Sequence, residues 1–489
     1  MQPPAWLRAA DRASPWAELT VAVAGLGVSG FAAADALLQL GARVLVLDAR
    51  PQDRLAGRVQ VIDALGAEVR LGDQGSAELP PQAQLVVTSP GWRPDSALLV
   101  SAATAGVPVW GEVELAWRLR ASQDPAPWLV VTGTNGKTTT VRMLAAMLHA
   151  DGRNAVAAGN IGTPLVEAVT SAAAFDVVAV ELSSFQLHWA SSPRPLAAAV
   201  LNLAPDHVDW HGSLAAYAAD KGRAYENCEV ACVYNVEDPQ TEQLVRAADV
   251  QEGCRAIGFT LGVPSVGMLG VVDDLLVDRA FGPQRRDWAA ELASIDDVAP
   301  AAPHNVANAL AAAALARAYG VAPGAVRAGL RAFRPDPHRI AAVAAVDGVR
   351  YVDDSKATNP HAAAAALAAY DRVVWVAGGL AKGAAFDELV QRARPRLRGV
   401  VLLGRDRAVI AAALARHAPE VPVVEVASTD TGVMDEVVRA AARLATPGDT
   451  VLLSPACASM DLFADYGVRG DVFAAAVRSL PGAQGEPAR

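Results

Sequence analysis

Residues 128–148, WLVVTGTNGKTTTVRMLAAML, contain the segment that decides the fold of this chain. The apolar run 128–132 predicts a buried strand, residues 133–139 form a glycine-rich turn, and the apolar residues that follow recur at the period of a helix. A strand, a glycine-rich turn and a helix in this order typically hold phosphate, because backbone N–H groups and the helix N-terminus point toward one anion. We therefore predict that Lys137 contacts the β- and γ-phosphates of a nucleotide and that Thr138 holds Mg²⁺.

The turn departs from the common phosphate-binding pattern G-x-x-x-x-G-K-[ST], because Val131 occupies the position of its first glycine. We interpret the turn as a shorter variant of that loop, since the strand before it and the helix after it are in the expected places. A turn that binds no ligand is the alternative. The predicted ATP-binding residues of the loop are Thr134, Asn135, Gly136, Lys137, Thr138, Thr139 and Thr140.

The same alternation of short apolar runs and Ala/Leu-rich helical stretches continues along the whole chain. This pattern predicts an α/β protein whose parallel sheets are covered by helices. A length of 489 residues is enough for roughly three domains. We place a Rossmann-like domain at residues 1–121, a central ATPase domain with the phosphate-loop variant at 122–334, and a second Rossmann-like domain at 335–489.

Charge and composition exclude several functional classes. A net charge of −10 argues against the basic surface that nucleic acids and anionic membranes require. The chain has no leader-like segment and no stretch of about 20 uncharged apolar residues, so we expect a cytoplasmic protein. Its cysteines, Cys228, Cys232, Cys254 and Cys457, form no C-x-x-C pair and have no ligand-like histidine spacing, which predicts free thiols in a reducing compartment.

Lysine is unusually rare, because arginine supplies 38 of the 42 basic residues. The four lysines are Lys137, Lys221, Lys356 and Lys382. The two side chains are not interchangeable, since lysine can lose its proton and react whereas arginine stays charged. Each lysine is therefore a candidate for chemistry, and a bias toward arginine with four accidental survivors is the alternative.

Three side chains are predicted to lie near the Mg²⁺ of the phosphate loop. Glu181 ends a predicted strand, His207 follows another, and Lys221 lies 14 residues later on a predicted helix. Strand ends of one parallel sheet meet in the same crevice, so Glu181 and His207 can both approach Mg²⁺. A lysine cation would repel the metal, but a neutral lysine amine can take up CO₂ to become a carbamate, which is an oxygen ligand. A salt bridge from Lys221 to Asp220 or Glu226 is the alternative.

A dinucleotide fingerprint opens the first domain. Residues 25–30, GLGVSG, follow the first predicted strand, and Asp48 ends the second. Taken alone, the motif predicts an NAD-dependent oxidoreductase. Its physics is more general, because glycines allow a backbone to approach a pyrophosphate and a carboxylate accepts hydrogen bonds from a ribose or a base. Any nucleotide diphosphate would satisfy it.

Two further motifs contain polar side chains that we predict to contact a nucleotide. His304-Asn305-x-x-Asn308 places two amides on one face of a helix, where they either cap the helix or read the edge of a base. Arg339 follows the predicted hinge at residues 334–337, and its guanidinium could reach a γ-phosphate from the third domain.

Together these motifs resemble the Mur ligase superfamily, and within it the branch that adds D-glutamate. The resemblance extends from about Val21 to about Val472. The superfamily motifs are Gly133-Thr134-Asn135-Gly136-Lys137-Thr138, Glu181, His304-Asn305-x-x-Asn308 and His338-Arg339. Those of the branch are Gly25-x-Gly27-x-x-Gly30 with Asp48, Ser89-Pro90-Gly91, the segment 181–187 (ELSSFQL), the segment 354–359 (DSKATN) and the segment 454–459 (SPACAS).

The resemblance implies ATP-driven amide formation in the synthesis of peptidoglycan precursors. ATP would phosphorylate the carboxylate of UDP-N-acetylmuramoyl-L-alanine, and the amine of D-glutamate would attack the acyl phosphate. Two Mg²⁺ ions would take part, one of them held by Glu181, His207 and a CO₂-derived carbamate on Lys221. The partners would be small molecules, and we expect a monomer. A sister ligase for another amino acid or for folate, and a nucleotide-binding module without catalysis, remain alternatives.

The resemblance also implies roles for individual positions. The UDP-substrate would be bound by Gly27, Val28, Ser29, Asp48, Ala49, Arg50, Ser89, Pro90, Gly91, Asn160 and His207. Asn305, Asn308, Arg339 and Asp354 would contact ATP, and the acyl phosphate would be surrounded by Lys137, His207, Lys221 and Lys356. D-glutamate would be held by Thr358, Lys382, Ser459 and Tyr466. The family often has Phe at position 466, and Gly467 replaces a common acidic residue.

Overall fold

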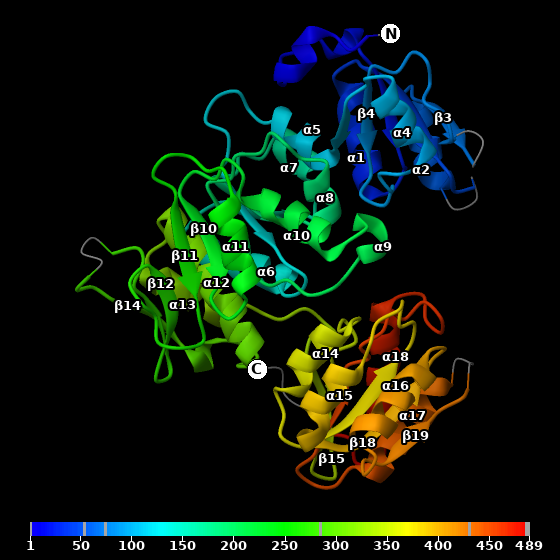
Figure 1. The fold of residues 1–489 in the computed structure, drawn as a ribbon, viewed down its shortest axis with the longest axis vertical. Coiled ribbons are helices and arrows are strands. Elements are labelled where there is room, and N and C mark those ends of the chain that lie inside the picture. The colour runs from blue at the N-terminus through cyan, green and yellow to red at the C-terminus, as the bar shows by residue number, and fades with distance from the viewer. Residues whose placement is uncertain (1, 52–54, 73–75, 283–285, 429–431, 485–489) are drawn as a thin grey trace. The chain divides into compact units, whose positions relative to one another are not determined.

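The computed structural model describes residues 2–51, 55–72, 76–282, 286–428 and 432–484 (Figure 1). The chain divides into two compact units, of which the first comprises Met1–Val298 with Asn305–Phe333, and the second Ala299–His304 with Arg334–Arg489. Three sheets flanked by helices confirm the predicted α/β class, and each predicted domain range contains one of them. The domain boundaries themselves stay predictions. Among the described helices, none is both long and apolar enough to cross a membrane.

The first sheet of the first unit is fully parallel, with the order β3-β2-β1-β4-β5. Strands β1, β2 and β4 are mostly apolar and buried, as expected for a parallel sheet that helices cover, whereas β3 at the edge of the sheet is partly exposed. The strand order reverses between β1 and β4, which is where sheets of this type bind nucleotides. The strands are β1 (Thr20–Ala24), β2 (Arg43–Asp48), β3 (Glu68–Leu71), β4 (Leu85–Thr88) and β5 (Val109–Gly111), and the helices are α1 (Val28–Gln39), α2 (Ala56–Ala64), α4 (Ala97–Thr104) and α5 (Glu112–Arg118).

The second sheet of the first unit has nine strands in the order β14-β13-β12-β11-β10-β9-β6-β8-β7. Its pairs are parallel from β7 to β12, and β13 and β14 are antiparallel additions. The strands are β6 (Trp128–Thr132), β7 (Ala155–Gly159), β8 (Val177–Glu181), β9 (Ala197–Val200), β10 (Ala231–Asn235), β11 (Arg255–Phe259), β12 (Met268–Val272), β13 (Leu275–Asp278) and β14 (Ala290–Ser294). The helices are α6 (Lys137–Ala150), α7 (Leu165–Thr170), α8 (Ser184–His188), α9 (Val208–His211), α10 (Leu214–Gly222), the 3₁₀ helix η4 (Arg223–Tyr225), α11 (Pro239–Ala247), α12 (Pro303–Tyr319) and α13 (Pro323–Ala332).

The second unit contains a six-stranded sheet with the order β15-β16-β20-β17-β18-β19. All its pairs are parallel except β15 with β16. The strands are β15 (Ala341–Val346), β16 (Val349–Asp353), β17 (Val373–Gly378), β18 (Leu397–Leu403), β19 (Val423–Glu425) and β20 (Thr450–Leu453). The helices are α14 (Pro360–Leu367), α15 (Asp387–Ala393), α16 (Arg407–His417), α17 (Val433–Leu444) and α18 (Tyr466–Arg478).

Glycine allows one of the close helix contacts in the first unit. Helix α13 packs against α6, the helix that follows the phosphate loop. A Cβ atom at Gly329 of α13 would overlap the backbone of Met147 on α6, whereas a Cβ atom at Gly324 of the same helix would meet open space. The two helices can approach this closely only because residue 329 has no side chain.

We therefore expect Gly329→Ala to destabilise the first unit by about 1–3 kcal/mol, because the methyl group forces α13 away from α6. Gly324→Ala is the matched control. It should be neutral or stabilising by up to about 1 kcal/mol, since alanine is the better helix former. Thermal unfolding monitored by calorimetry measures both, and equal midpoints for the two variants would contradict the close-packing explanation.

Candidate active site

Four neighbouring strands of the nine-stranded sheet end on the same side, and each ends at or just before a predicted or newly identified site residue. Strand β6 leads into the phosphate loop, residues 133–140, while β7 leads to Asn160, β8 ends at Glu181 and β9 leads to Asn202. These strands are parallel, so their carboxyl ends line the same crevice.

The phosphate loop is clamped by an asparagine that sequence reasoning missed. The backbone N–H of Asn135 donates to Asn202 Oδ1 at 2.9 Å, and Asn202 Nδ2 donates to the Asn135 carbonyl at 3.1 Å. The N–H of Thr134 also donates to the Asn202 carbonyl, at 3.0 Å. Asn202 is a polar residue just after a buried strand, which is the same signal that identified Glu181.

Two further contacts shape the loop. Gly136 precedes α6 with φ of 86°, a left-handed conformation that favours glycine. A Cβ atom there would collide with the side chain of Asn308, so the predicted amide lies directly against the loop. Asn308 Nδ2 donates to Asn305 Oδ1 at 3.3 Å, which brings both predicted asparagines to this edge.

The four threonines of the loop are used differently. The Thr134 hydroxyl contacts the Tyr217 hydroxyl at 2.9 Å, and the buried Thr140 hydroxyl donates to the Gly136 carbonyl at 3.0 Å. Both hydroxyls therefore hold the loop in shape. Thr139 is also buried, while the partly exposed Thr138 lies in the first turn of α6. Of the four, Thr138 is the best placed to offer its hydroxyl to a ligand.

Glu181 offers a free oxygen in a buried position. Its side chain is 1 % exposed, and Oε1 accepts from Asn160 Nδ2 at 2.8 Å. Within the described residues, Oε2 has no hydrogen-bond donor. A buried carboxylate oxygen without a partner is costly unless a cation or a proton satisfies it. The pair of Asn160 and Glu181 thus fits a site for Mg²⁺, which prefers oxygen ligands.

Lys221 lies at the phosphate loop and is only 2 % exposed. Its Nζ donates to the Gly133 carbonyl at 2.8 Å, and the Nζ of Lys137 donates to the same oxygen at 2.8 Å. Two ammonium groups that share one acceptor repel each other. Burial and the nearby charge of Lys137 lower the pKa of Lys221 well below its ordinary value. The amine of Lys221 is therefore suited to the neutral form that takes up CO₂.

The alternative salt bridge of Lys221 is not formed. In the part of the chain that the structure describes, no ion pair joins Lys221 to Asp220 or Glu226. Asp220 instead contacts His188 Nδ1 at 2.9 Å and His211 Nδ1 at 2.8 Å. The carboxylate next to Lys221 in sequence is thus already paired.

His207 stands at the edge of this site. It has φ of 51° and precedes α9, and its half-exposed ring packs against Phe185 with 4.7 Å between ring centroids. Phe185 belongs to α8, whose start is fixed by a capping box in which Ser183 accepts from the N–H of Gln186 at 3.2 Å. The segment 181–187 therefore orients both Glu181 and the aromatic neighbour of His207.

A cavity of about 550 Å³ lies at the carboxyl end of the five-stranded sheet, where the strand order reverses between β1 and β4. All nine predicted UDP-substrate residues of this domain line it, namely Gly27, Val28, Ser29, Asp48, Ala49, Arg50, Ser89, Pro90 and Gly91. Trp92, Arg93 and Ser96 also line it, and sequence reasoning missed them. The two remaining UDP-substrate predictions, Asn160 and His207, lie in the nine-stranded region described above.

Asp48 braces this cavity. It is 3 % exposed, and it accepts from the N–H of Leu26 at 2.6 Å and from Arg50 Nε and Nη2 at 3.0 and 2.6 Å. Burial alone would raise the pKa of Asp48, but the hydrogen bonds from Arg50 and Leu26 bring it below its ordinary value. The carboxylate thus stays ionised and joins the glycine turn to the end of β2.

The second unit gathers its predicted residues on three neighbouring strands, β16, β20 and β17. Their carboxyl ends carry Lys356, Ser459 and Lys382 respectively. Backbone hydrogen bonds join these loops, from Ala456 to the Ala357 carbonyl at 2.9 Å and from Leu380 to the Ala458 carbonyl at 2.8 Å. The three predicted residues therefore belong to one connected edge.

Individual positions on this edge differ in exposure. Lys356 Nζ lies 3.7 Å from the ring centroid of Tyr466, a cation–π contact. Lys382 is exposed with φ of 49°, and Ser459 is 4 % exposed. Thr358 is partly buried, and its N–H donates to the Lys356 carbonyl at 2.9 Å.

Asp354 and Arg339 lie beside this edge. Asp354 accepts from the Ser454 hydroxyl at 2.9 Å and from the N–H of Ile340 at 3.3 Å. Burial raises its pKa to about 7. Arg339 lies 3.8 Å from Asp336 and keeps part of its guanidinium exposed.

A buried arginine that sequence reasoning missed ties this edge together. Arg469 is 1 % exposed, and it donates to the Ser355 hydroxyl at 2.9 Å, to the Ser355 carbonyl at 2.8 Å and to the Cys457 carbonyl at 3.1 Å. It thereby joins the segments 354–359 and 454–459. Nothing in the spacing of the sequence distinguishes Arg469 from the many other arginines.

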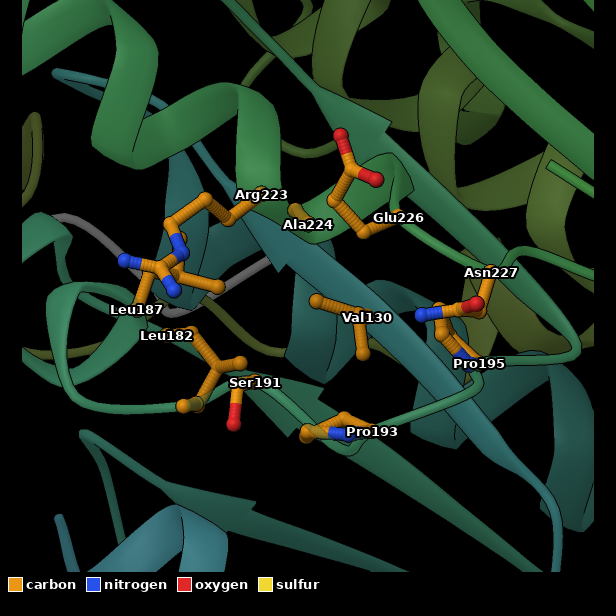
Figure 2. A pocket seen from close by; sticks show the side chains of 11 residues that line it. Val130, Leu182, Leu187, Ser191, Pro193, Pro195, Arg223, Ala224, Glu226 and Asn227 are labelled. Carbon is orange, nitrogen blue, oxygen red and sulfur yellow. The ribbon is translucent and has the colours of Figure 1, made fainter. Parts of the chain in front are cut away.

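A separate cavity of about 330 Å³ in the first unit contains none of the predicted site residues. Figure 2 shows Val130 of β6 between the η4 side, with Ala224 and Glu226, and the loop that carries Ser191 and Pro193. One of its lining residues, Arg223, is two positions after Lys221 in the sequence. Most of the lining residues are apolar. Its position does not support a role in binding the predicted substrates.

Comparisons with known proteins agree with this geometry. Family descriptions match as "Mur ligase MurD-like, N-terminal domain" at residues 19–111, "Mur ligase middle domain" at 131–316 and "Mur ligase, glutamate ligase domain" at 338–457. A relative from Streptomyces avermitilis named UDP-N-acetylmuramoylalanine--D-glutamate ligase is 64% identical over 465 residues, covering 95% of this chain and 99% of the relative. One of the same name from Mycolicibacterium smegmatis is 50% identical over 497 residues, covering 94% and 97%.

Solved structures show the same fold at low sequence identity. UDP-N-acetylmuramate-alanine ligase MurC from Thermotoga maritima superposes with a TM-score of 0.54 at 19% identity, covering 94% of this chain and 99% of that one. MurF from Acinetobacter baumannii gives a TM-score of 0.56 at 17% identity, covering 84% and 86%. At these identities the likeness concerns the fold alone.

Proposed function

This chain belongs to the Mur ligase family, and from that membership we propose that it joins D-glutamate to UDP-N-acetylmuramoyl-L-alanine in a reaction driven by ATP. One observation carries the proposal. Relatives 50–64% identical over at least 94% of this chain bear the name of that ligase. The oxidoreductase interpretation of residues 25–30 leaves the phosphate loop without a purpose.

The reaction proceeds in two steps. The γ-phosphoryl group of ATP passes to the alanine carboxylate, which gives an acyl phosphate and ADP. The amine of D-glutamate then attacks the acyl carbon, an amide bond forms, and phosphate leaves. In both steps positioning and charge neutralisation do most of the work, because the phosphoryl oxygens carry several negative charges.

We assign ATP binding to the phosphate loop of the first unit. The backbone N–H groups at the start of α6 and the Lys137 ammonium would bind the phosphates, and Asn305 and Asn308 would lie on the adenine side. The arrangement of Asn202 and Asn308 around the loop supports this assignment, because Asn202 fixes the loop backbone by hydrogen bonds and Asn308 packs against Gly136. Arg339 and Asp354 belong to the second unit, and their contacts with ATP stay predictions.

Mg²⁺ is assigned to Thr138 and to the group of Glu181, His207 and carbamylated Lys221. Bound there, Mg²⁺ would neutralise charge on the phosphate and carboxylate oxygens. The free Oε2 of Glu181 and the buried amine of Lys221 support the assignment. Carbamylation converts Lys221 from a cation beside Lys137 into an anion, which removes the repulsion between the two lysines.

D-glutamate is assigned to the edge of the second unit that carries Thr358, Lys382, Ser459 and Tyr466. The exposed Lys382 ammonium would pair with a carboxylate of the amino acid. Lys356 is assigned to the acyl phosphate. The connected loops of β16, β17 and β20 support a single binding site for a small acidic molecule.

The release of ADP tests the proposed function. ADP should appear only when UDP-N-acetylmuramoyl-L-alanine and D-glutamate are both present, and no nicotinamide-dependent change in absorbance should accompany it. Other amino acids and folate substrates in the same assay test the sister ligases. ADP release with a different amino acid would overturn the substrate assignment, and ATP binding without ADP release would indicate a binding module.

The UDP-substrate assignment predicts a selective effect of Asp48→Asn. Asparagine keeps the shape of the side chain but loses the charge-assisted hydrogen bonds from Arg50 and Leu26. We expect KM for the UDP-substrate to rise about 10-fold with little change in kcat. The lost hydrogen bonds weaken binding of the substrate and of the transition state by the same amount. Glu68→Gln on β3 is the control, since it removes an exposed carboxylate outside the cavity. Equal KM values for both variants would contradict the assignment.

A further inference from the structure

Three cysteines whose sequence spacing shows no metal-binding pattern come together in the first unit. Cys228 follows η4, Cys232 lies in β10 and Cys254 directly precedes β11. Their sulfur atoms all lie within 4.8 Å of one another, and the Sγ atoms of Cys232 and Cys254 are 3.8 Å apart. We call this group the cysteine triad. All three are free thiols.

The backbone around the cysteine triad is fixed by hydrogen bonds between its two segments. The N–H of Gln251 donates to the Cys228 carbonyl at 3.0 Å, and the N–H of Arg255 donates to the Val230 carbonyl at 3.0 Å. Strands β10 and β11 then continue as a parallel pair. The β10–β11 strand pair and the hydrogen bonds between the two preceding segments thus fix the positions of the three cysteines. The sulfurs are therefore preorganised for a ligand.

The distance between two of the sulfurs matches the coordination of a soft metal ion, and the third lies within 4.8 Å of both. Sulfur ligands lie about 2.3 Å from Zn²⁺, so two sulfurs of a tetrahedral site are about 3.8 Å apart. The observed separation of Cys232 and Cys254 has this value. Cys228 and Cys232 are buried, whereas Cys254 is partly exposed, which leaves a path to solvent and a fourth position for water.

We propose that the cysteine triad binds one thiophilic divalent cation, with Zn²⁺ as the ion to be tested. Binding breaks the three S–H bonds and forms three metal–sulfur bonds, and the protons pass to solvent, so the step needs no oxidant. The site lies at the amino ends of β10 and β11, whereas the phosphate loop follows the carboxyl end of β6 in the same parallel array. The proposed ion therefore lies away from the phosphate loop, and it is distinct from the Mg²⁺ assigned to the reaction.

The exposure of the thiols supports this placement. The Cys228 thiol donates to the Ala231 carbonyl at 3.2 Å, so the backbone already holds this buried sulfur. Cys254 is the partly exposed member of the cysteine triad, and an incoming ion would reach its sulfur first.

The test uses the full-length, untagged chain, reduced and freed of metal with a chelator. Titration with Co²⁺ should produce the sulfur-to-metal charge-transfer absorption that reports thiolate ligands, and Zn²⁺ should displace it at one equivalent per chain. Cys254→Ser, which changes the most exposed cysteine, should weaken Zn²⁺ binding at the thiol site about 100-fold or more. Cys457→Ser, a buried cysteine of the second unit, is the matched control and should bind like the wild type.

Two results would overturn the proposal. One is the absence of thiolate charge transfer in the wild-type chain, even if Zn²⁺ binds at the Glu181 and His207 site. The other is equal Zn²⁺ affinity in wild type and Cys254→Ser. Because the charge-transfer signal is read on the wild-type chain, the proposal stays testable if a serine variant fails to fold, and its failure leaves the proposed ligase function untouched.

Discussion

Lys221→Arg is expected to be almost inactive, with kcat/KM at least about 10³-fold below the wild-type value. The Lys221 amine is buried and shares the Gly133 carbonyl with Lys137, so its neutral form is favoured. Arginine keeps its charge and cannot form a carbamate. A permanent cation would then occupy the position that the proposal gives to an anionic metal ligand. Steady-state ADP release measures the loss.

A rescue experiment separates the missing anion from damage to the fold. Lys221→Ala should regain part of its activity when a short-chain carboxylate is added, because the small anion can enter the space left by the lysine. Chloride at the same ionic strength is the control for the added salt. Labelled CO₂ should give a carbamate carbon resonance in the wild type that is absent from Lys221→Ala. Wild-type activity in Lys221→Arg would contradict carbamylation.

Lys137→Ala is expected to lower kcat about 10³-fold or more, because it removes the positive charge at the start of α6 that neutralises the transferred phosphoryl group. KM for ATP should rise as well. Binding of the UDP-substrate should be unchanged, since its cavity lies in the other sheet of the unit, and calorimetric titration measures this directly.

The matched control for Lys137→Ala is Arg142→Ala, which removes an exposed cation from the same helix outside the phosphate loop. It should retain activity within about twofold, since surface charges contribute little at this distance from a site. Equal losses in both variants would show that helix charge in general matters, and that Lys137 has no specific role.

Much of the fold could be predicted from the sequence, because parallel strands and their helices have strong periodic patterns. The strand ends at Glu181 and Asp48, the turn before α6 and the helix that carries Lys221 all lie where the spacing placed them. Asn202 was within reach of the same reasoning. It follows β9 in the position that a crevice-lining residue takes, yet a single asparagine gives a weak signal in a sequence.

Arg469 and the cysteine triad could not have been found this way. Arg469 acts through hydrogen bonds to two segments that lie 12 and 114 residues away in the chain. Cys228, Cys232 and Cys254 show no metal-binding spacing, and only the pairing of β10 with β11 brings them together. Such groups depend on strand register and loop path, which periodicity does not encode.

The unequal exposure of the four lysines has a practical consequence for covalent labelling. An amine-reactive electrophile meets an exposed primary amine at Lys382, whereas Lys221 is buried and Lys137 is held by two carbonyls of its own loop. The fourth lysine, Lys356, is partly buried and packs on the Tyr466 ring. Attachment of a dye or a resin through lysine would therefore favour the position assigned to D-glutamate. Coupling through another functional group would keep that position free, and a mild acylating fragment with an acidic arm becomes a starting point for a site-directed covalent ligand.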